Sequence, residues 1–260
     1  AVAAGEFDIA IHSGKDLPFR VFSGTEYLSI LPRETPNDVF IPRSRGDTVS
    51  SLRPGAVIGT NSNRRRANLR SVRPDLAFAD YAGNITTRIL SEQMEKNRVD
   101  GIVMAAAGLR RLGLYDAGAM QLLPNAECLP AANQGILAAQ MRAGGDEKLA
   151  AAARTLQHRE TAFAWRAERS FLEAFDAGCD TPISVFADFT GARSATSVVL
   201  RARVPQKGGA ACIAFEQSSS LTDGGIDALD AEADTLGRAL ADRVNAAGAR
   251  ETIATPDDFA

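Results

Sequence analysis

The sequence predicts an α/β protein with a separate α+β domain at its carboxyl end. From residue 54 onward, short apolar segments alternate with helical segments, which is typical of a parallel sheet flanked by helices. Beyond residue 155, a helical stretch precedes three strand-like segments and the amphipathic helix Asp227–Ala247, an order that is typical of an α+β domain. Ligands of α/β proteins bind at the carboxyl ends of the strands, so we expect the site there.

The amino-terminal part is predicted to consist mainly of short strands. Asp8–His12 is apolar enough for a strand, and Ser13–Pro18 forms a polar loop at its carboxyl end. Two apolar runs, Tyr27–Leu31 and Val39–Ile41, flank a Pro/Asn turn and are predicted as strands that lead out of this first lobe. Because one strand does not make a sheet, we expect that earlier elements of this lobe are missing from this chain.

The middle of the chain shows the clearest alternation. Its predicted strands are 56–59, 76–81 and 101–106, and its predicted helices are 61–73, 85–97 and 108–114. The connection Leu129–Gly135 then leads into a predicted helix at Ile136–Met141, and residues 147–178 are strongly helical. The strands predicted for the last part are 183–188, 197–204 and 211–215.

Composition and charge argue against several classes of function. The chain has 260 residues and a formal net charge of -3, so no global field favours nucleic acid or a membrane surface. No apolar run in the sequence approaches the roughly 18 residues of a membrane span. Cys128, Cys179 and Cys212 are too irregularly spaced for a disulfide framework or a zinc site, which favours a reducing compartment. The sequence contains no glycine-rich nucleotide motif, and no pattern of a hydrolase triad.

Cys179 directly follows a predicted helix. Phe171, Leu172 and Phe175 follow helical spacing, and Gly178 stands where a left-handed residue would end the helix. The thiol should therefore lie on a fixed loop, and a lone thiol in an enzyme is a candidate nucleophile or attachment point. The alternative is a small buried hydrophobe, which is a common role of free cysteine. This stretch alone leaves both alternatives open.

The basic residues are mostly arginine, because only four of the 29 are lysine. A GC-rich genome would account for this bias, and so would planar, bidentate recognition of carboxylates or phosphates. Polar and basic side chains also follow four strands in turn: Ser13, Lys15 and Asp16; Thr60, Ser62, Arg64 and Arg65; Thr87 and Arg88; Arg110 and Arg111. Arg64 and Arg65 lie in a first helical turn, where cations oppose the helix dipole unless an anion offsets them. This repetition favours a polycarboxylate ligand over four solvated helix faces.

Asp16 is the carboxylate within this set. Among several arginines it should stay ionised, and it could then stabilise a cation formed during a reaction or accept a hydrogen bond from a ligand N–H. The alternative is a surface ion pair with Lys15, which would contribute little to stability.

Seven short segments, in the right order, resemble the porphobilinogen deaminase (hydroxymethylbilane synthase) family. They are Asp8–Pro18 (DIAIHSGKDLP), Gly59–Arg65 (GTNSNRR), Arg73–Arg88 (RPDLAFADYAGNITTR), Ala107–Leu114 (AGLRRLGL), Leu129–Gly135 (LPAANQG), Glu160–Arg169 (ETAFAWRAER) and Gly178–Ile183 (GCDTPI). The resemblance implies two α/β domains like type II periplasmic binding proteins, the first of them incomplete, and a carboxyl-terminal α+β domain that carries the cofactor cysteine. The implied domains are 1–37 with 130–152, 38–129, and 153–260.

The resemblance also implies an activity. The family joins four porphobilinogen molecules head to tail into hydroxymethylbilane, a linear tetrapyrrole, with release of ammonia. It does so on a dipyrromethane cofactor that a thioether attaches to one cysteine, which by position is Cys179. We therefore expect a small-molecule substrate, no metal, no nucleic acid and no membrane partner. The implied protein is a monomeric, cytoplasmic transferase of porphyrin and heme biosynthesis.

The family's site residues carry over by position. Asp16, with Lys15, matches the catalytic positions, where the carboxylate serves the pyrrole nitrogens and the cationic intermediate. The cofactor-binding positions are matched by Cys179, Ser13, Thr60, Ser62, Arg64, Arg65 and Arg88. The substrate-binding positions are matched by Arg111, Thr87 and Gln134.

The chain also departs from the family. It is expected to lack an amino-terminal stretch that lines the family's cleft, and Ala82 stands where the family has a carboxylate-binding arginine. A charge-assisted hydrogen bond contributes about 1.5–3 kcal/mol, so losing the arginine would weaken a substrate step without abolishing chemistry. Asn63 replaces an apolar residue, Asn133 replaces a glycine, and Gln140 stands at an acidic position. Two alternatives therefore stay open: a degenerate relative that binds a tetrapyrrole or another polycarboxylate without catalysis, and a generic anion-binding module.

Overall fold

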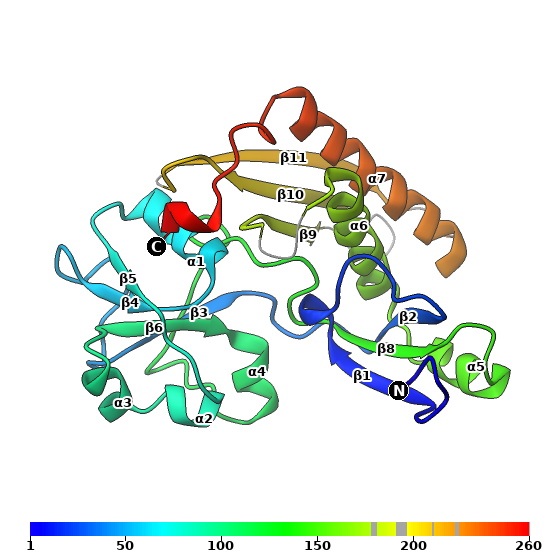
Figure 1. Cartoon of the computed structure of the whole chain (residues 1–260), viewed down its shortest axis with the longest axis horizontal. Helices are drawn as coiled ribbons and strands as arrows, with labels where there is room; N and C mark the ends of the chain where they lie inside the picture. Colours follow the sequence, from blue (N-terminus) through cyan, green and yellow to red (C-terminus); the bar gives the residue numbers. More distant parts are fainter. Residues whose placement is uncertain (178–180, 191–196, 210, 222–223, 260) are drawn as a thin grey trace.

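Three sheets organise the part of the protein that the structure describes. The computed structural model describes residues 1–177, 181–190, 197–209, 211–221 and 224–259. Figure 1 shows each sheet in a unit of its own: the first sheet described below lies at the lower right of the view, the second at the lower left and the third at the top. The mixed α/β class predicted from the sequence is confirmed, whereas the domain boundaries given above stay a prediction.

The elements, in chain order, have the following bounds. The strands are β1 (Ile9–Ser13), β2 (Thr25–Ile30), β3 (Asp38–Pro42), β4 (Val57–Gly59), β5 (Ala77–Ala79), β6 (Gly101–Ala105), β7 (Gln121–Leu122), β8 (Leu137–Arg142), β9 (Ser184–Thr190), β10 (Ser197–Pro205) and β11 (Cys212–Ser220). The α-helices are α1 (Asn63–Val72), α2 (Ile85–Arg88), α3 (Ser91–Lys96), α4 (Ala106–Arg111), α5 (Glu147–Thr155), α6 (Arg159–Phe175) and α7 (Ile226–Ala246). Two short 3-10 helices are η1 (Gly14–Asp16) and η2 (Pro256–Phe259).

The first sheet has the order β1-β8-β2, and both of its pairings are antiparallel. The central strand β8 corrects a prediction, because the helix expected at Ile136–Met141 is wrong. In the register, Met141 lies opposite both Ile9 and Glu26. The segment is a strand because it has a hydrogen-bonding partner along each edge, and this tertiary context overrides its local preference.

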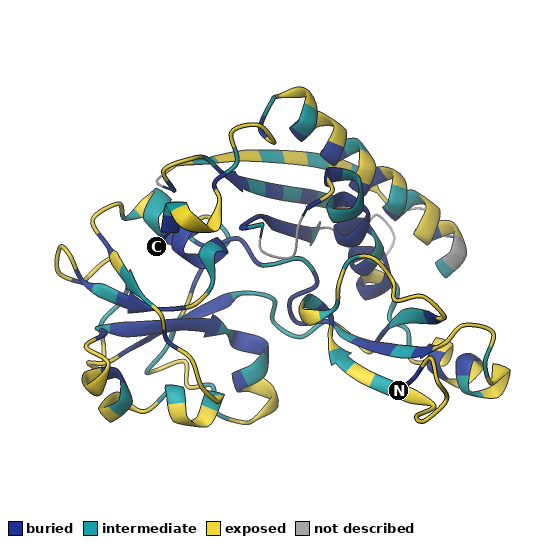
Figure 2. Cartoon of the chain, viewed as in Figure 1, coloured by how far each residue is buried: buried dark blue, intermediate teal, exposed yellow. Residues whose placement is uncertain are grey.

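The second sheet has the order β5-β4-β6-β3-β7. β4 runs parallel to β5 and β6, as the alternating pattern predicts, whereas β3 runs antiparallel to β6 and β7. Figure 2 shows β3 and β6 as mostly buried. The single helix predicted at 85–97 is broken into α2 and α3, because Leu90 has extended backbone angles and starts α3 as its N-cap. This sheet and its helices position Arg64 and Arg65.

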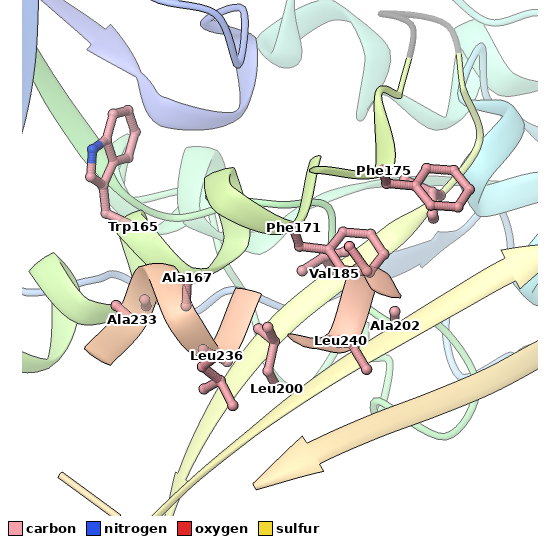
Figure 3. Packing of buried hydrophobic residues seen from close by; sticks show 14 of the residues in the cluster. Trp165, Ala167, Phe171, Phe175, Val185, Leu200, Ala202, Ala233, Leu236 and Leu240 are labelled. Carbon is pink, nitrogen blue, oxygen red and sulfur yellow. The ribbon is translucent and has the colours of Figure 1, made fainter. Parts of the chain in front are cut away.

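The third sheet is the antiparallel order β11-β10-β9, and α6 and α7 pack against it. Figure 3 shows Phe171 of α6, Leu200 of β10 and Leu240 of α7 in the shared core. The two helices approach closely at Gly237, where a Cβ atom would lie 2.4 Å from the carbonyl oxygen of Ala167. These contacts fix α6, which faces the candidate site on its other side.

The end of α6 differs from the prediction. The helix ends at Phe175, and Asp176 takes the left-handed conformation, with φ 54°. The predicted cap, Gly178, lies outside the described residues. The Asp176 carboxylate accepts hydrogen bonds from Arg20 at 2.8 Å and from Arg250 at 3.2 Å, which ties the end of α6 to the segment after η1.

The carboxyl-terminal segment returns to the unit of the second sheet, where η2 lies beside α1 (Figure 1). Arg66 of α1 donates to the carbonyl oxygen of Phe259 at 2.6 Å, and the Phe259 ring packs with Ala67 and Ala254. Within the described part of the chain, no helix combines the length and apolar character needed to cross a bilayer.

Candidate active site

The loop after β1 carries two of the predicted site residues. Ser13 ends β1 and is exposed, and η1 then places Lys15 half-buried and Asp16 exposed. The Gly14 N–H donates to the carbonyl oxygen of Ile136 at 2.8 Å. A Cβ atom at Gly14 would lie 2.9 Å from the Trp165 ring, so a larger residue would displace its neighbours. The loop is therefore held tightly between α6 and the segment before β8.

Arg169 of α6 holds the same loop from the other direction. Its Nη2 donates to the carbonyl oxygen of Pro18 at 2.8 Å and also to that of Phe19. The guanidinium lies over the rings of Trp165 and Tyr27, with centroid distances of 4.7 and 5.3 Å. Arg169 is 3% exposed, and burial lowers the pKa of its guanidinium below the usual value. Because arginine remains charged at neutral pH, this contact is a charge-assisted anchor for the loop.

A cavity of about 410 Å³ opens between the loop and α6. Its described lining is Gly14–Phe19, Ala131–Asn133, Arg169, Leu172, Ala177, Thr181 and Ile183. Lys15 and Asp16 contribute charge to the cavity, and Leu172 contributes apolar surface. Ala177 and Thr181 come from either side of residues 178–180, so the predicted cofactor residue Cys179 itself lies outside the described residues.

Arg64 and Arg65, predicted to bind a ligand's carboxylates, share an internal partner in Asp38. The Arg64 Nη2 and the Arg65 Nε lie 2.7 and 2.8 Å from the two carboxylate oxygens of Asp38, which is fully buried. Arg64 also donates to the carbonyl oxygen of Leu129 at 2.5 Å. Burial raises the pKa of Asp38, but the two cations outweigh burial and hold that pKa well below its usual range. Ligand binding by both arginines stays a prediction beside this structural role.

Gln134 connects Asp38 to the loop after β1. Its Nε2 donates to Asp38 at 3.1 Å and to the carbonyl oxygen of Pro36 at 2.6 Å. Its Oε1 accepts from the Lys15 Nζ at 3.5 Å. Burial, and then the Arg65 cation, lower the pKa of Lys15 from 10.5 to about 8. The structure thus brings Lys15, Gln134 and both arginines into one polar cluster around Asp38.

Thr60 and Ser62 form the start of α1. Thr60 is fully buried, and its Oγ1 accepts from the Ser62 N–H at 3.2 Å. The Ser62 hydroxyl accepts from the Arg65 N–H at 3.4 Å and caps the helix. Neither side chain belongs to the described lining of the cavity. Their predicted contacts with a cofactor stay a prediction.

Three further predicted site residues lie on helices beside the second sheet: Thr87 and Arg88 on α2, and Arg111 on α4. None of them belongs to the described lining of the cavity. The Arg88 guanidinium lies over the Tyr81 ring, 5.7 Å from the ring centroid. Burial lowers the pKa of Arg88. Thr87 is exposed on α2. Arg111 is exposed and donates to the carbonyl oxygen of Gly135 at 2.8 Å, so α4 contacts the connection that carries Gln134. Their assignment to cofactor or substrate also stays a prediction.

Glu168 is a buried carboxylate that the sequence patterns do not single out. It accepts hydrogen bonds from the Arg33 guanidinium at 2.6 Å, the Asn133 N–H at 2.5 Å and the Ala187 N–H at 2.8 Å. These bonds join α6 to β9 and to the segment before β8. In the sequence, the only signal for Glu168 is that it belongs to a charged stretch that interrupts an otherwise apolar helix face.

Asp38 and Arg169 also escape the sequence patterns, for different reasons. Asp38 stands directly before the apolar run Val39–Ile41, and a carboxylate at the start of a buried strand is a weak signal that it has a buried partner. Arg169 follows Trp165 at helical spacing, so a cation and an aromatic ring on one face could have indicated their contact. Among the described residues, no three His, Cys, Asp or Glu side chains gather as a metal site would require.

Comparisons with known proteins agree with the sequence segments. A family model described as porphobilinogen deaminase, dipyromethane cofactor binding domain, matches residues 1–151, and a model of the C-terminal domain of the same enzyme matches residues 162–245. The porphobilinogen deaminase of Streptococcus sanguinis is 40% identical over 74% of this chain, and the match spans 62% of that protein. The porphobilinogen deaminase of Moorella thermoacetica is 36% identical over 97% of this chain, and the match spans 75% of that protein. A solved structure, described as the probable amino-acid ABC transporter extracellular-binding protein of Bacillus subtilis, is 12% identical with a TM-score of 0.34, covering 57% of this chain and 62% of that chain. The chain belongs to the porphobilinogen deaminase family.

Proposed function

We propose that the chain is a hydroxymethylbilane synthase. It joins four porphobilinogen molecules head to tail, with release of ammonia, on a dipyrromethane that a thioether attaches to Cys179. The observation that carries the proposal is the cavity that Asp16 shares with Ala177 and Thr181, the described neighbours of the cysteine segment. A carboxylate suited to a pyrrolic cation therefore lies in the same cavity as both ends of that segment. Family membership supports the same conclusion.

The residues around the cavity fit a dipyrromethane in size and chemistry. The volume of about 410 Å³ lies within the range of small-molecule sites. Leu17, Leu172 and Ile183 offer apolar surface for ring faces, and the Lys15 ammonium offers charge for a carboxylate. When bound, the dipyrromethane would supply the free ring carbon to which the first porphobilinogen is joined. Besides Cys179, the residues proposed to hold it are Ser13, Thr60, Ser62, Arg64, Arg65 and Arg88; those proposed for substrate are Arg111, Thr87 and Gln134.

Asp16 is proposed as the catalytic carboxylate, with Lys15 beside it. A fixed anion stabilises a developing cation best when it is in place before the reaction. Arg169 supplies this preorganisation, because it anchors the two carbonyl groups that follow the Asp16 turn. Asp16 would accept a hydrogen bond from a pyrrole N–H and stabilise the cation that forms as ammonia leaves porphobilinogen.

The proposal includes a monomeric enzyme in the cytoplasm that needs neither nucleic acid nor a membrane partner. Cys128 and Cys212 are free thiols, which supports a reducing compartment. The porphobilinogen substrate is a small anionic molecule, which agrees with the cations around Asp38 and the cavity.

Incubation of the purified chain with porphobilinogen tests the proposed activity. Uroporphyrin should appear after acid oxidation of the product, and the intact mass should show two covalently held pyrrole units. Cys179→Ser should lose both the added mass and all turnover. The matched control is Cys212→Ser, a cysteine half-buried in β11, which should keep both.

Three outcomes would contradict parts of the proposal. An unmodified mass at Cys179 together with no product would overturn the activity. Added mass on Cys128 or Cys212 would overturn the attachment site. Tight pyrrole binding without turnover would favour the degenerate, non-catalytic relative.

A further inference from the structure

Asn68 of α1 is a completely buried amide whose hydrogen-bonding capacity is fully used. Its Nδ2 donates to the carbonyl oxygen of Arg64 at 2.8 Å and to the Ser184 hydroxyl at 3.0 Å. Its Oδ1 accepts from the Leu129 N–H and from the Arg203 Nη1, both at 3.1 Å. An asparagine side chain has two donor N–H bonds and one oxygen with two lone pairs, so these four contacts use all of them. A polar network satisfied to this extent holds its members in one arrangement.

Two of the partners of Asn68 lie next to the walls of the cavity. Ser184 is the first residue of β9 and directly follows Ile183, which lines the cavity. Leu129 opens the connection that leads to β8, and Ala131–Asn133 of the same connection line the cavity. The buried amide therefore ties α1 to two segments that shape the candidate site.

The double-arginine pair belongs to the same part of α1. Asn68 lies one helical turn after Arg64, on the same side of the helix. The two residues hold Leu129 together, because Asn68 accepts from its N–H and the Arg64 guanidinium donates to its carbonyl oxygen at 2.5 Å. Asp38 fixes the Arg64 guanidinium at 2.7 Å. One side of α1 thus carries both a fixed cation and the anchor of β9.

The anchored strand leads back to the proposed attachment residue. Only four residues separate Cys179 from Ser184 in the sequence, so an anchor at Ser184 limits how far the attachment residue can lie from α1. A ligand that is tethered at one end reaches the arginines only if the tether and the arginines lie at a matching distance. A misplacement of about 1 Å in such an arrangement can cost about 100-fold in rate.

We propose that Asn68 is a positioning residue that holds the start of β9 against α1, and thereby sets the distance between the attachment cysteine and the double-arginine pair. The inference rests on the proposed function, since it takes Cys179 to carry a dipyrromethane whose carboxylates bind Arg64 and Arg65. Asn68 is not part of the described lining of the cavity, so it acts through Ser184 and through the connection to β8.

Attachment of the cofactor tests this role without relying on turnover. The cofactor-free chain, purified from cells that make no porphobilinogen, is mixed with porphobilinogen, and the intact mass follows the gain of two pyrrole units. In Asn68→Ala, the rate of this gain should fall about 10- to 100-fold, because the attachment segment is no longer held beside the arginines. Among molecules that carry the cofactor, kcat should fall by a similar factor, while the KM for porphobilinogen should stay within about twofold.

Ser184→Ala removes only the hydrogen bond between the amide and β9. It should lower both rates by a smaller factor, and it keeps the test available if Asn68→Ala does not fold. Because Asn68→Ala already breaks this bond, adding Ser184→Ala to it should cause little further loss. Hydrogen exchange gives an independent readout: in the cofactor-free Asn68→Ala chain, the amides of β9 should exchange faster, while those of α5 should not change.

Two control variants separate positioning from general stability. Ser71→Ala removes a hydrogen bond within the same helix, from the Ser71 hydroxyl to the Asn68 carbonyl oxygen at 2.7 Å, and leaves the Asn68 side chain in place. Val244→Ala shortens a completely buried side chain of α7 and should lower the melting temperature. Both controls should keep the wild-type rate of cofactor attachment.

The outcomes distinguish this inference from the proposed function. Wild-type rates of attachment and turnover in Asn68→Ala would overturn the positioning role, and so would losses that Val244→Ala reproduces at the same drop in melting temperature. Normal loading and uroporphyrin formation by the wild type would leave the proposed function intact in either case. A wild type that gains no pyrrole units would overturn the proposed function and this inference with it.

Discussion

The carboxylate of Asp38 lies 2.7 Å from the guanidinium of Arg64, and both side chains are almost completely buried. Arg65 contacts the second oxygen of the same carboxylate at 2.8 Å. Two adjacent cations are thus held by one anion inside the protein, and their shared position depends on Asp38. Burial lowers the pKa of Arg64, but the Asp38 charge outweighs burial and raises it. The double-arginine motif is therefore part of the interior of the fold, whatever else it contacts.

Asp38→Asn should destabilise the protein strongly. Removing one partner of a buried ion pair leaves an uncompensated charge and costs about 3–5 kcal/mol of folding free energy. Because the pKa of Asp38 is lowered in the folded state, the carboxylate's contribution is fully present at neutral pH and is lost only as the pH falls below 3.8. Urea unfolding monitored by circular dichroism at pH 7 measures the loss.

Glu147→Gln is the matched control for this experiment. Glu147 forms an exposed ion pair with Arg154 at 2.8 Å, and exposed pairs contribute little because solvent and salt screen them. Its unfolding midpoint should match the wild type. Equal midpoints for Asp38→Asn and the wild type would contradict the structural role of Asp38.

Arg169→Gln should lower turnover more than it lowers stability. The variant loses the charge-assisted bonds to Pro18 and Phe19, so the loop that carries Asp16 is no longer held. A displacement of about 1 Å in a catalytic group can cost 100-fold, so we expect kcat to fall about 10- to 100-fold. Rates of uroporphyrin formation at saturating porphobilinogen measure this effect, and thermal melting checks the fold.

Arg166→Gln provides the comparison on the same helix. Arg166 lies one helical turn before Arg169 but pairs with Asp234 of α7 at 2.7 Å, away from the loop. Its substitution should affect melting temperature with little effect on kcat. If both variants lowered kcat and melting temperature in parallel, Arg169 would act through general stability and not by positioning the loop.

Local patterns predict most of the elements, because most helices and strands here agree with their own sequence preferences. The helix predicted at 61–73 and the strand predicted at 101–106 match α1 and β6 to within about two residues. The segment Ile136–Met141 is the exception. Its alanines, leucine, glutamine and methionine favour a helix, but β1 and β2 flank it on both edges and make it a strand. Those partners are distant in the chain and leave no local signal.

Short motifs single out Lys15, Asp16 and Gln134, and the structure places Lys15 and Asp16 in the cavity lining and Gln134 in contact with Lys15, while their roles stay predictions. The direction in which a side chain points is a tertiary property, so the sequence could not show that Arg64 and Arg65 meet Asp38. Spacing identifies the arginines as a pair in a first helical turn. It does not distinguish an anion supplied by a ligand from an anion supplied by the protein itself.

The pKa of Lys15 predicts how ligand affinity changes with pH. Lowered to about 8 by burial and the Arg65 cation, Lys15 is an ammonium below that pH and a neutral amine above it. The kcat/KM for porphobilinogen should therefore fall as the pH rises through about 8, because carboxylate binding loses a cation. Lys15→Arg keeps the charge and should shift or remove this decline. A pH profile that is the same in both proteins would contradict the role of Lys15.

Lys15 should also affect stability, with a defined sign. The unfolded chain has a lysine pKa near 10.5, so it binds more protons than the folded protein between about pH 8 and 10.5. Lys15 therefore makes the free energy of unfolding rise with pH across that window. Urea midpoints of the wild type and Lys15→Met, compared at pH 7.5 and 9.5, measure this contribution. The wild type should gain stability relative to Lys15→Met as the pH rises from 7.5 to 9.5, because methionine does not titrate.

Cys128 should be inert in the folded protein, which restricts where a thioether can form. Burial, and then the negative charge of Asp38, raise the pKa of the Cys128 thiol to about 12. At pH 8 only about one molecule in 10,000 then carries the thiolate, which is the reactive form. Iodoacetamide should leave Cys128 unmodified in the native protein and label it fully in urea, as peptide mass spectrometry would show. Rapid native labelling would contradict this burial, and would restore Cys128 as a candidate attachment site beside Cys179.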